Sequence, residues 1–260
     1  MLTTAATYRM VANDLARSLD TTSKRPDVAR ETAYYLKNIG NVKSIDDFLG
    51  DDRLFAYAMK AFGLQDMSYA KAFMRKVLTE GIDDKKSFAN TLTDPRYKEF
   101  AEAFNFKRYG NATTVFDRAQ QGTVDRYVRQ TLEQDAGQKN EGVRLALYFE
   151  RKAGSIESAF HILADAALLK VVQTALAIPA ATVAMDIDKQ AKLIESRLDV
   201  ADLKDPAKLK KFLTRFAALW EVNNPSSTQV SPAVLFAQPL ETGIGMDLIA
   251  SLQKLKLGGG

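Results

Sequence analysis

The sequence predicts an all-α fold: a multi-helix globular array with an internal two-fold sequence pseudo-repeat and a largely non-helical C-terminal tail. Three observations lead to this prediction. Apolar residues recur at helical spacing along nearly the whole chain. Period-two alternation and the hairpin dipeptides Asn-Gly and Asp-Gly are missing. The same order of helical segments, followed by a similar tetrad, occurs in both halves of the chain.

The composition is that of a folded protein. Of 260 residues, 46% are hydrophobic and 26% are charged, which excludes long disorder, a collagen repeat and a disulfide-stapled miniprotein. The length allows one large domain or two small ones.

Helix start and stop signals place the first elements. Pro26 and Gly40 bracket a predicted helix over residues 27–39, and Ser44 with Asp47 resembles a capping box. An apolar stripe predicts a helix over residues 67–80, with Gly81 as its C-cap. Later runs with the same period predict helices over residues 124–132, 142–152, 158–177, 187–198 and 209–222.

The repeat is found by aligning Asp51 with Asp165, which matches apolar positions such as Leu54 with Leu168. Each half then reaches a tetrad, Leu-Thr-Asp-Pro at 92–95 and Leu-Lys-Asp-Pro at 203–206, followed by phenylalanines four residues apart. Chance similarity among amphipathic helices is the alternative. A true repeat predicts that residues 44–106 superpose on residues 155–218 with the same helix order.

This pattern divides the chain into a helical body and a tail. The body, residues 1–222, consists of N-terminal helices (1–41), repeat half one (42–110), a connecting helical region (111–154) and repeat half two (155–222). The tail, residues 223–260, contains three prolines, and between residues 223 and 253 it has only two charged residues. It either folds back on the body or docks a partner. A short amphipathic helix there gives the candidate partner-binding residues Leu248, Ile249, Leu252 and Leu255.

Few residues suited to catalysis are available. Cysteine is absent and His161 is the single histidine, so thiolate nucleophiles and Cys- or His-rich metal sites are excluded. His161 lies between apolar neighbours in a helical run and is expected to pack there with one hydrogen bond. Phosphate-binding glycine loops and a serine-nucleophile elbow are also missing. We therefore predict no catalytic, cofactor-binding or metal-binding residues, and no cofactor.

Acidic pairs have a structural explanation. The pairs at 46–47, 51–52 and 83–84 stand where helices are predicted to start, and carboxylates there cap free amide groups. The segment that begins Asp186-Ile187-Asp188 resembles a calcium loop, but Ala191 stands where that loop requires glycine. Calcium binding is therefore rejected.

The formal net charge is only +4, so a nucleic-acid footprint is disfavoured. In the most basic aromatic stretch, residues 96–109, Tyr97, Phe100 and Phe104 share the spacing of one buried helix face. The beginning of the chain has no signal-peptide pattern and no apolar run is long enough for a membrane span, so a cytoplasmic location is expected.

Five longer segments of the chain resemble one known family. They are VKSIDDFL (42–49), AMKAFGL (58–64), YAKAFMRKVL (69–78), EGVRLALYFERK (141–152) and LLKVVQTAL (168–176). The family they resemble is alphaproteobacterial, has no assigned function, and its genes often lie among those for flagellar basal-body and export proteins. The resemblance covers nearly the whole chain. It implies an all-helical cytoplasmic protein that is linked to flagellar assembly or motility and associates with the flagellar basal body.

Three classes of function follow. The preferred hypothesis is a non-enzymatic helical interaction protein, structural or chaperone-like, that binds a flagellar or other protein partner. The alternatives are a nucleic-acid-binding helical protein and an enzyme without a recognisable motif.

Overall fold

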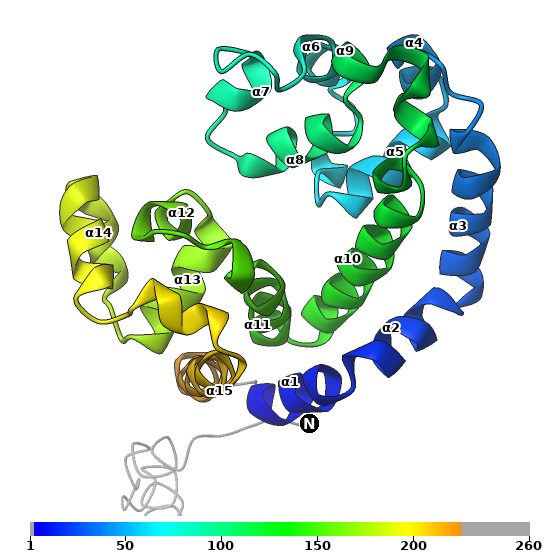
Figure 1. The fold of residues 1–260 in the computed structure, drawn as a ribbon. Helices are drawn as coiled ribbons and strands as arrows, with labels where there is room; N and C mark the ends of the chain where they lie inside the picture. The colour runs from blue at the N-terminus through cyan, green and yellow to red at the C-terminus, as the bar shows by residue number, and fades with distance from the viewer. Residues whose placement is uncertain (1–2, 225–260) are drawn as a thin grey trace, which may run out of the picture. The chain divides into compact units, whose positions relative to one another are not determined.

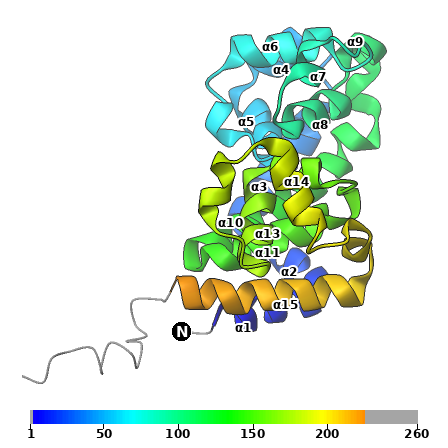
Figure 2. The same ribbon diagram turned by 90° about the vertical axis from the view of Figure 1, so that its left-hand side faces the viewer.

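The computed structural model describes residues 3–224, and Figures 1 and 2 show their helical arrangement. Most of these residues are helical and none of them forms a strand, which confirms the all-α prediction. Their α-helices are α1 (Thr4–Asn13), α2 (Leu15–Ser23), α3 (Pro26–Ile39), α4 (Ile45–Gly50), α5 (Asp52–Ala61), α6 (Lys71–Glu80), α7 (Phe88–Thr91), α8 (Pro95–Ala103), α9 (Phe106–Tyr109), α10 (Gln121–Lys139), α11 (Glu141–Lys152), α12 (Ala159–Leu163), α13 (Ala166–Ala175), α14 (Ile187–Glu195) and α15 (Pro206–Asn223).

Short 3₁₀ helices link several of these elements. They are η1 (Gln65–Met67), η2 (Gly110–Val115), η3 (Asp117–Ala119), η4 (Ala153–Ser155), η5 (Ala180–Ala184) and η6 (Val200–Lys204). The candidate partner-binding residues Leu248, Ile249, Leu252 and Leu255 lie outside the described residues, as does the rest of the tail from residue 225.

Several local signals are confirmed. Pro26 is the first residue of α3, where its missing N–H is not needed. The capping box at α4 is complete: the Asp47 N–H donates to Ser44 Oγ at 3.1 Å, and the Ser44 N–H donates to Asp47 Oδ2 at 3.0 Å. Gly81 ends α6 with φ +60°, as a C-cap glycine can. Gly40 ends α3 with φ −65°, a conformation open to any residue.

Two predicted helices have different limits in the structure. The helix expected over residues 158–177 is two helices, because the Asp165 carboxylate accepts from the N–H groups of Ala167 and Leu168 and thereby starts α13. Apolar periodicity runs through this break and cannot reveal it. The helix expected from residue 67 starts at Lys71 instead, since the preceding residues form η1.

The helix order predicted for the repeat is found in both halves, with the α-helix α7 of the first matched by the 3₁₀ helix η6 of the second. The first half runs α4, α5, η1, α6, α7, α8, and the second runs α12, α13, η5, α14, η6, α15. The aspartates of the two tetrads, Asp94 and Asp205, are N-caps of α8 and α15. Superposition of the two backbones stays a prediction.

The correspondence reaches further than the sequence alignment. Asp51 caps α5 and accepts from the Tyr34 hydroxyl of α3, just as Asp165 caps α13 and accepts from the Tyr148 hydroxyl of α11. The equivalent helices α5 and α13 also end alike. A left-handed residue follows each helix, Gly63 (φ +70°) in the first half and Ala177 (φ +51°) in the second.

The two halves have separate apolar cores, and each core contains a helix from elsewhere in the chain. The first core joins α3 to α9 with residues of α10, and the second joins α11 to α15 with Tyr8 of α1. Accordingly α10 packs on α5 as well as α11 (Figure 1), and α1 packs on α11 and α15. Because α10 packs on helices of both cores and α1 leads through α2 into α3 of the first core, these two helices link the halves.

The matched helix ends give a paired prediction. An added Cβ at Gly63 meets only ordinary contacts, so Gly63→Ala should destabilise through its left-handed backbone, by about 1–2 kcal/mol. Ala177→Gly should relieve the same strain and stabilise by up to about 1 kcal/mol. Urea unfolding of both variants measures the difference. Equal shifts of the same sign would contradict the assignment.

A second prediction concerns the contact of α11 with α15. A Cβ at Gly142 would overlap the Trp220 indole ring, so Gly142→Ala should cost about 1–3 kcal/mol of unfolding free energy. Gly40→Ala is the matched control, because its position is open and its φ is ordinary. Thermal melting should drop only for the Gly142 variant.

Candidate functional site

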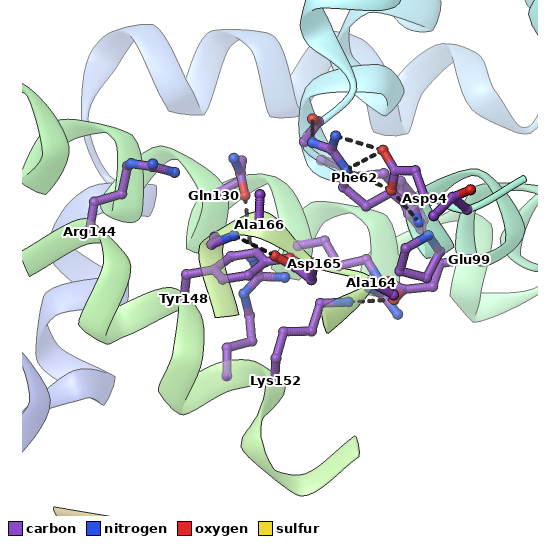
Figure 3. A pocket seen from close by; sticks show the side chains of 18 residues that line it. Phe62, Asp94, Glu99, Gln130, Arg144, Tyr148, Lys152, Ala164, Asp165 and Ala166 are labelled. Atoms are coloured by element: carbon purple, nitrogen blue, oxygen red, sulfur yellow. Dashed lines mark hydrogen bonds and ion pairs between the residues drawn. The ribbon is translucent and has the colours of Figure 1, made fainter. Parts of the chain in front are cut away.

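The candidate site is a cleft along the seam between the two repeat halves. Three adjoining hollows of about 390, 350 and 510 Å³ share Glu99 and Lys152 as lining residues, and we call them together the seam cleft. One wall comes from the end of α5 and the start of α8. The opposite wall comes from α11 and the start of α13, and α10 lies between them (Figure 3).

The repeated capping aspartates stand in both walls. Asp94, the N-cap of α8, lines the cleft on one side, and Asp165, the N-cap of α13, lines it on the other. The Tyr148 hydroxyl donates to Asp165 Oδ2. Burial, and then the charge and hydrogen bond of Asp165, raise the pKa of Tyr148, so its phenol stays protonated.

Arg96 links two elements of the first wall. Its Nε and Nη2 donate to Asp94, at 3.0 and 2.7 Å, and its Nη1 donates to the Gly63 carbonyl at the end of α5. Burial raises the pKa of Asp94, but hydrogen bonds from the Arg96 guanidinium and N–H outweigh it, so the net shift is downward. Asp94 is therefore held as a carboxylate.

Glu99 of α8 is the ionic link across the seam. Its Oε1 pairs with Lys152 Nζ of α11, and its Oε2 lies 3.4 Å from Arg126 Nη1 of α10 (Figure 3). The guanidinium of Arg126 also lies over the Phe62 ring, 4.9 Å from its centroid. These contacts bring three helices together around one carboxylate.

A buried ionic cluster supports the cleft from below. The Glu133 carboxylate, which is only 1% exposed, accepts from Arg129 Nε at 2.9 Å and from Arg151 Nε and Nη2 at 2.8 Å each. Arg129 also donates to the Leu147 carbonyl. Burial disfavours charge on Arg151, but its bonds to Glu133 outweigh burial and raise its pKa. The cluster fixes α10 against α11 and thereby orients the basic wall.

The lining of the first hollow has an excess of two positive charges. It contains five cations and three carboxylates. The second hollow exposes more apolar than polar surface, with Leu92, Pro95, Ile156 and Leu168 in its lining, although Lys98, Glu99, Lys152 and Asp165 also line it. The arrangement can bind an anionic group beside an apolar one. The cations are Arg96, Arg126, Arg144, Arg151 and Lys152, and the carboxylates are Asp94, Glu99 and Asp165.

Comparisons with known proteins place the chain in a family. Residues 61–209 match the family described as "Protein of unknown function (DUF1217)", which is more than half of the sequence. The chain belongs to this family. It is also similar to a protein from Agrobacterium tumefaciens whose crystal structure was solved by a structural genomics consortium. That structure has 54% sequence identity and a TM-score of 0.78, covering 84% of this chain and 93% of the other. A search of curated proteins found no match.

This outcome confirms the family resemblance as far as a domain of unknown function and a relative in Agrobacterium. Among the described residues, the DUF1217 protein has no helix long and apolar enough to cross a membrane. The same part of the chain contains no group of three or more acidic or histidine residues suited to a metal ion.

One sequence-predicted position differs in the structure. His161 is exposed at the edge of the second hollow and is not packed in the core, because it lies on the outer face of the short helix α12. Its Nδ1 accepts from the Glu157 N–H at 3.2 Å, so the expected single hydrogen bond is present.

The structural explanations of the other motifs are confirmed. Phe100 and Phe104 are buried and Tyr97 packs against the same core, as their helical spacing predicted. Asp186 caps α14 through the Asp188 N–H. The pair at 83–84 is the exception, because no helix starts there: Asp83 pairs with Arg108, and Asp84 accepts from the Lys86 N–H in the turn before α7.

Sequence reasoning missed the seam cleft itself. Its residues come from segments far apart in the chain, and no single motif contains them. Two local signals were present: Arg129 and Glu133 stand one helical turn apart, and the segment 141–152 of the family resemblance contains Tyr148, Arg151 and Lys152.

A pH-dependent prediction follows from Asp94. Its folded pKa lies below the unfolded value, so its contribution to stability is complete above the unfolded pKa and is lost as the pH falls through the folded pKa. Asp94→Asn keeps a side-chain N-cap but loses the ion pair with Arg96, so it should lower the unfolding free energy by up to about 1 kcal/mol at neutral pH. The difference should shrink below about pH 4.

Asp205→Asn is the matched control, since Asp205 occupies the same tetrad position and caps α15 through the N–H groups of Ala207 and Lys208. It lies exposed and is not clamped by an arginine as Asp94 is. Urea unfolding across the pH range should show the smaller change for Asp205→Asn. A larger effect there would contradict the role given to Arg96.

Proposed function

We propose that this DUF1217 protein is a non-enzymatic helical interaction protein, structural or chaperone-like, that serves flagellar assembly or motility in the cytoplasm. One observation carries the interaction role. All three carboxylates that line the first hollow of the seam cleft are already engaged: Asp94 by Arg96, Glu99 by Lys152 and Arg126, and Asp165 by Tyr148 and the start of α13. The cleft's own carboxylates thus already have partners, and the guanidinium N–H groups of Arg126 beyond Nη1 suit capture of a partner group.

Exposed apolar side chains give further support. Val183, Met185 and Ile187 follow one another at alternate positions from η5 into α14, and 40–56% of each is exposed. Apolar groups that gather on a surface are typical of protein contact sites. The flagellar setting rests on the family resemblance of the longer segments, whose genes often lie among those for basal-body and export proteins.

A motility assay tests the cellular role. We expect a strain that lacks the gene to swim poorly in soft agar, and a plasmid with the wild-type gene to restore swimming. Leu248→Asp combined with Leu252→Asp should fail to restore swimming if that face of the tail binds the partner. The purified double variant must remain soluble and melt at the wild-type temperature for this comparison.

Two outcomes would contradict the proposal. Normal swimming of the deletion strain would remove the motility role. Full restoration by the soluble double variant would remove the tail face as the docking element, although the interaction role of the body would stand.

A further inference from the structure

We propose that the seam cleft binds an acidic peptide segment of a partner protein, with an apolar side chain next to its carboxylate. This inference rests on the proposed function of protein interaction and adds the chemistry of the partner. It concerns the described body alone and does not involve the tail.

The first argument is the juxtaposition of two kinds of lining. The basic hollow and the apolar hollow share Thr93, Pro95 and Ala164 in addition to Glu99 and Lys152, so they adjoin each other. A ligand that fills both needs a negative group and an apolar group a few ångströms apart. Neighbouring residues of a peptide provide this combination.

The second argument is where the cations are accessible. Arg126 keeps 44% of its side chain exposed, whereas Arg144 donates to Glu141 through Nε and Nη2 and Arg151 is held by Glu133. The contact of Arg126 with Glu99 is long, at 3.4 Å, while Glu99 keeps its closer partner Lys152. An incoming carboxylate can therefore replace Glu99 on Arg126 without leaving Glu99 unpaired.

The third argument separates a peptide from a nucleic acid. A phosphate backbone needs a continuous row of cations, and its affinity comes mainly from charge. Here Asp94 and Glu99 interrupt the basic lining and would repel successive phosphates. The second hollow adds one cation, Lys98, beside apolar surface from Leu92, Ile156 and Leu168, so it does not extend the row of cations that a phosphate backbone needs. One or two carboxylates beside a leucine-like side chain fit both features.

Fluorescence anisotropy with the full-length protein tests the inference. The probe is a short labelled peptide in which a pair of glutamates is flanked by leucines. Two matched peptides carry glutamines in place of the glutamates or serines in place of the leucines. We expect the acidic, apolar peptide to bind, and each matched peptide to bind at least about tenfold more weakly, because each loses one of the two contacts.

A pair of variants locates the binding. Arg126→Gln should lower the affinity for the acidic, apolar peptide by about tenfold, since it removes a charge-assisted donor that the Glu133 cluster does not use. Arg30→Gln is the matched control: Arg30 lies on α3 outside the cleft, is exposed, and has a similarly long contact of 3.5 Å with Glu31. The Arg30→Gln variant should bind the peptide with the wild-type affinity. Both variants should keep the wild-type circular dichroism and melting temperature.

Three results would overturn the inference. The first is equal affinity for the glutamate and glutamine peptides, and the second is an equal loss of peptide affinity in the two arginine variants. The third is a single-stranded oligonucleotide that binds the wild-type protein more tightly than the acidic, apolar peptide does and no longer binds after Arg126→Gln. Failure here is distinct from failure of the proposed function. A non-motile deletion strain whose protein binds no peptide would reject only the cleft chemistry, and peptide binding with normal swimming would reject only the motility role.

Discussion

The placement of one buried carboxylate governs much of this structure. Glu133 is removed from water, and a charge in that position is tolerated only because Arg129 and Arg151 donate to it together. Arg129 lies on the same helix as Glu133, and Arg151 lies on α11, so the cluster sets the register of α10 against α11. Loss of either arginine would remove part of the hydrogen bonding that this buried carboxylate needs. The position of the next residue, Lys152, follows from this register.

The repeat explains why a cleft lies at this place. Each half begins its second helix, α5 or α13, with an aspartate cap bonded to a tyrosine. The caps of two non-equivalent helices, Asp94 of α8 and Asp165 of α13, both line the seam cleft. The packing of α10 in the first core and of Tyr8 from α1 in the second core joins the halves. The seam is thus a region where two similar units meet with different side chains, and this difference gives the cleft its own chemistry.

Preorganisation connects this architecture with the proposed interaction role. The guanidinium of Arg96 is fixed by Asp94 and the Gly63 carbonyl, and that of Arg151 is fixed by Glu133. A ligand that meets donors already in place loses less conformational freedom on binding than one that must order them. The more exposed Arg126 can exchange Glu99 for a ligand carboxylate. The cleft therefore combines two fixed guanidinium groups, those of Arg96 and Arg151, with one that can change its partner.

The sequence by itself determined the helical class, the capping of α4 by Ser44 and Asp47, and the helix order of the repeat, because each depends on contacts within one or two helical turns. It did not reveal the break at Asp165, since the apolar period continues through it, nor the exposure of His161, which depends on the shortness of α12. Only the tertiary structure determined which residues line the seam cleft. Glu99 and Lys152 are 53 positions apart, and their pairing depends on how α8, α10 and α11 pack, which no local pattern encodes.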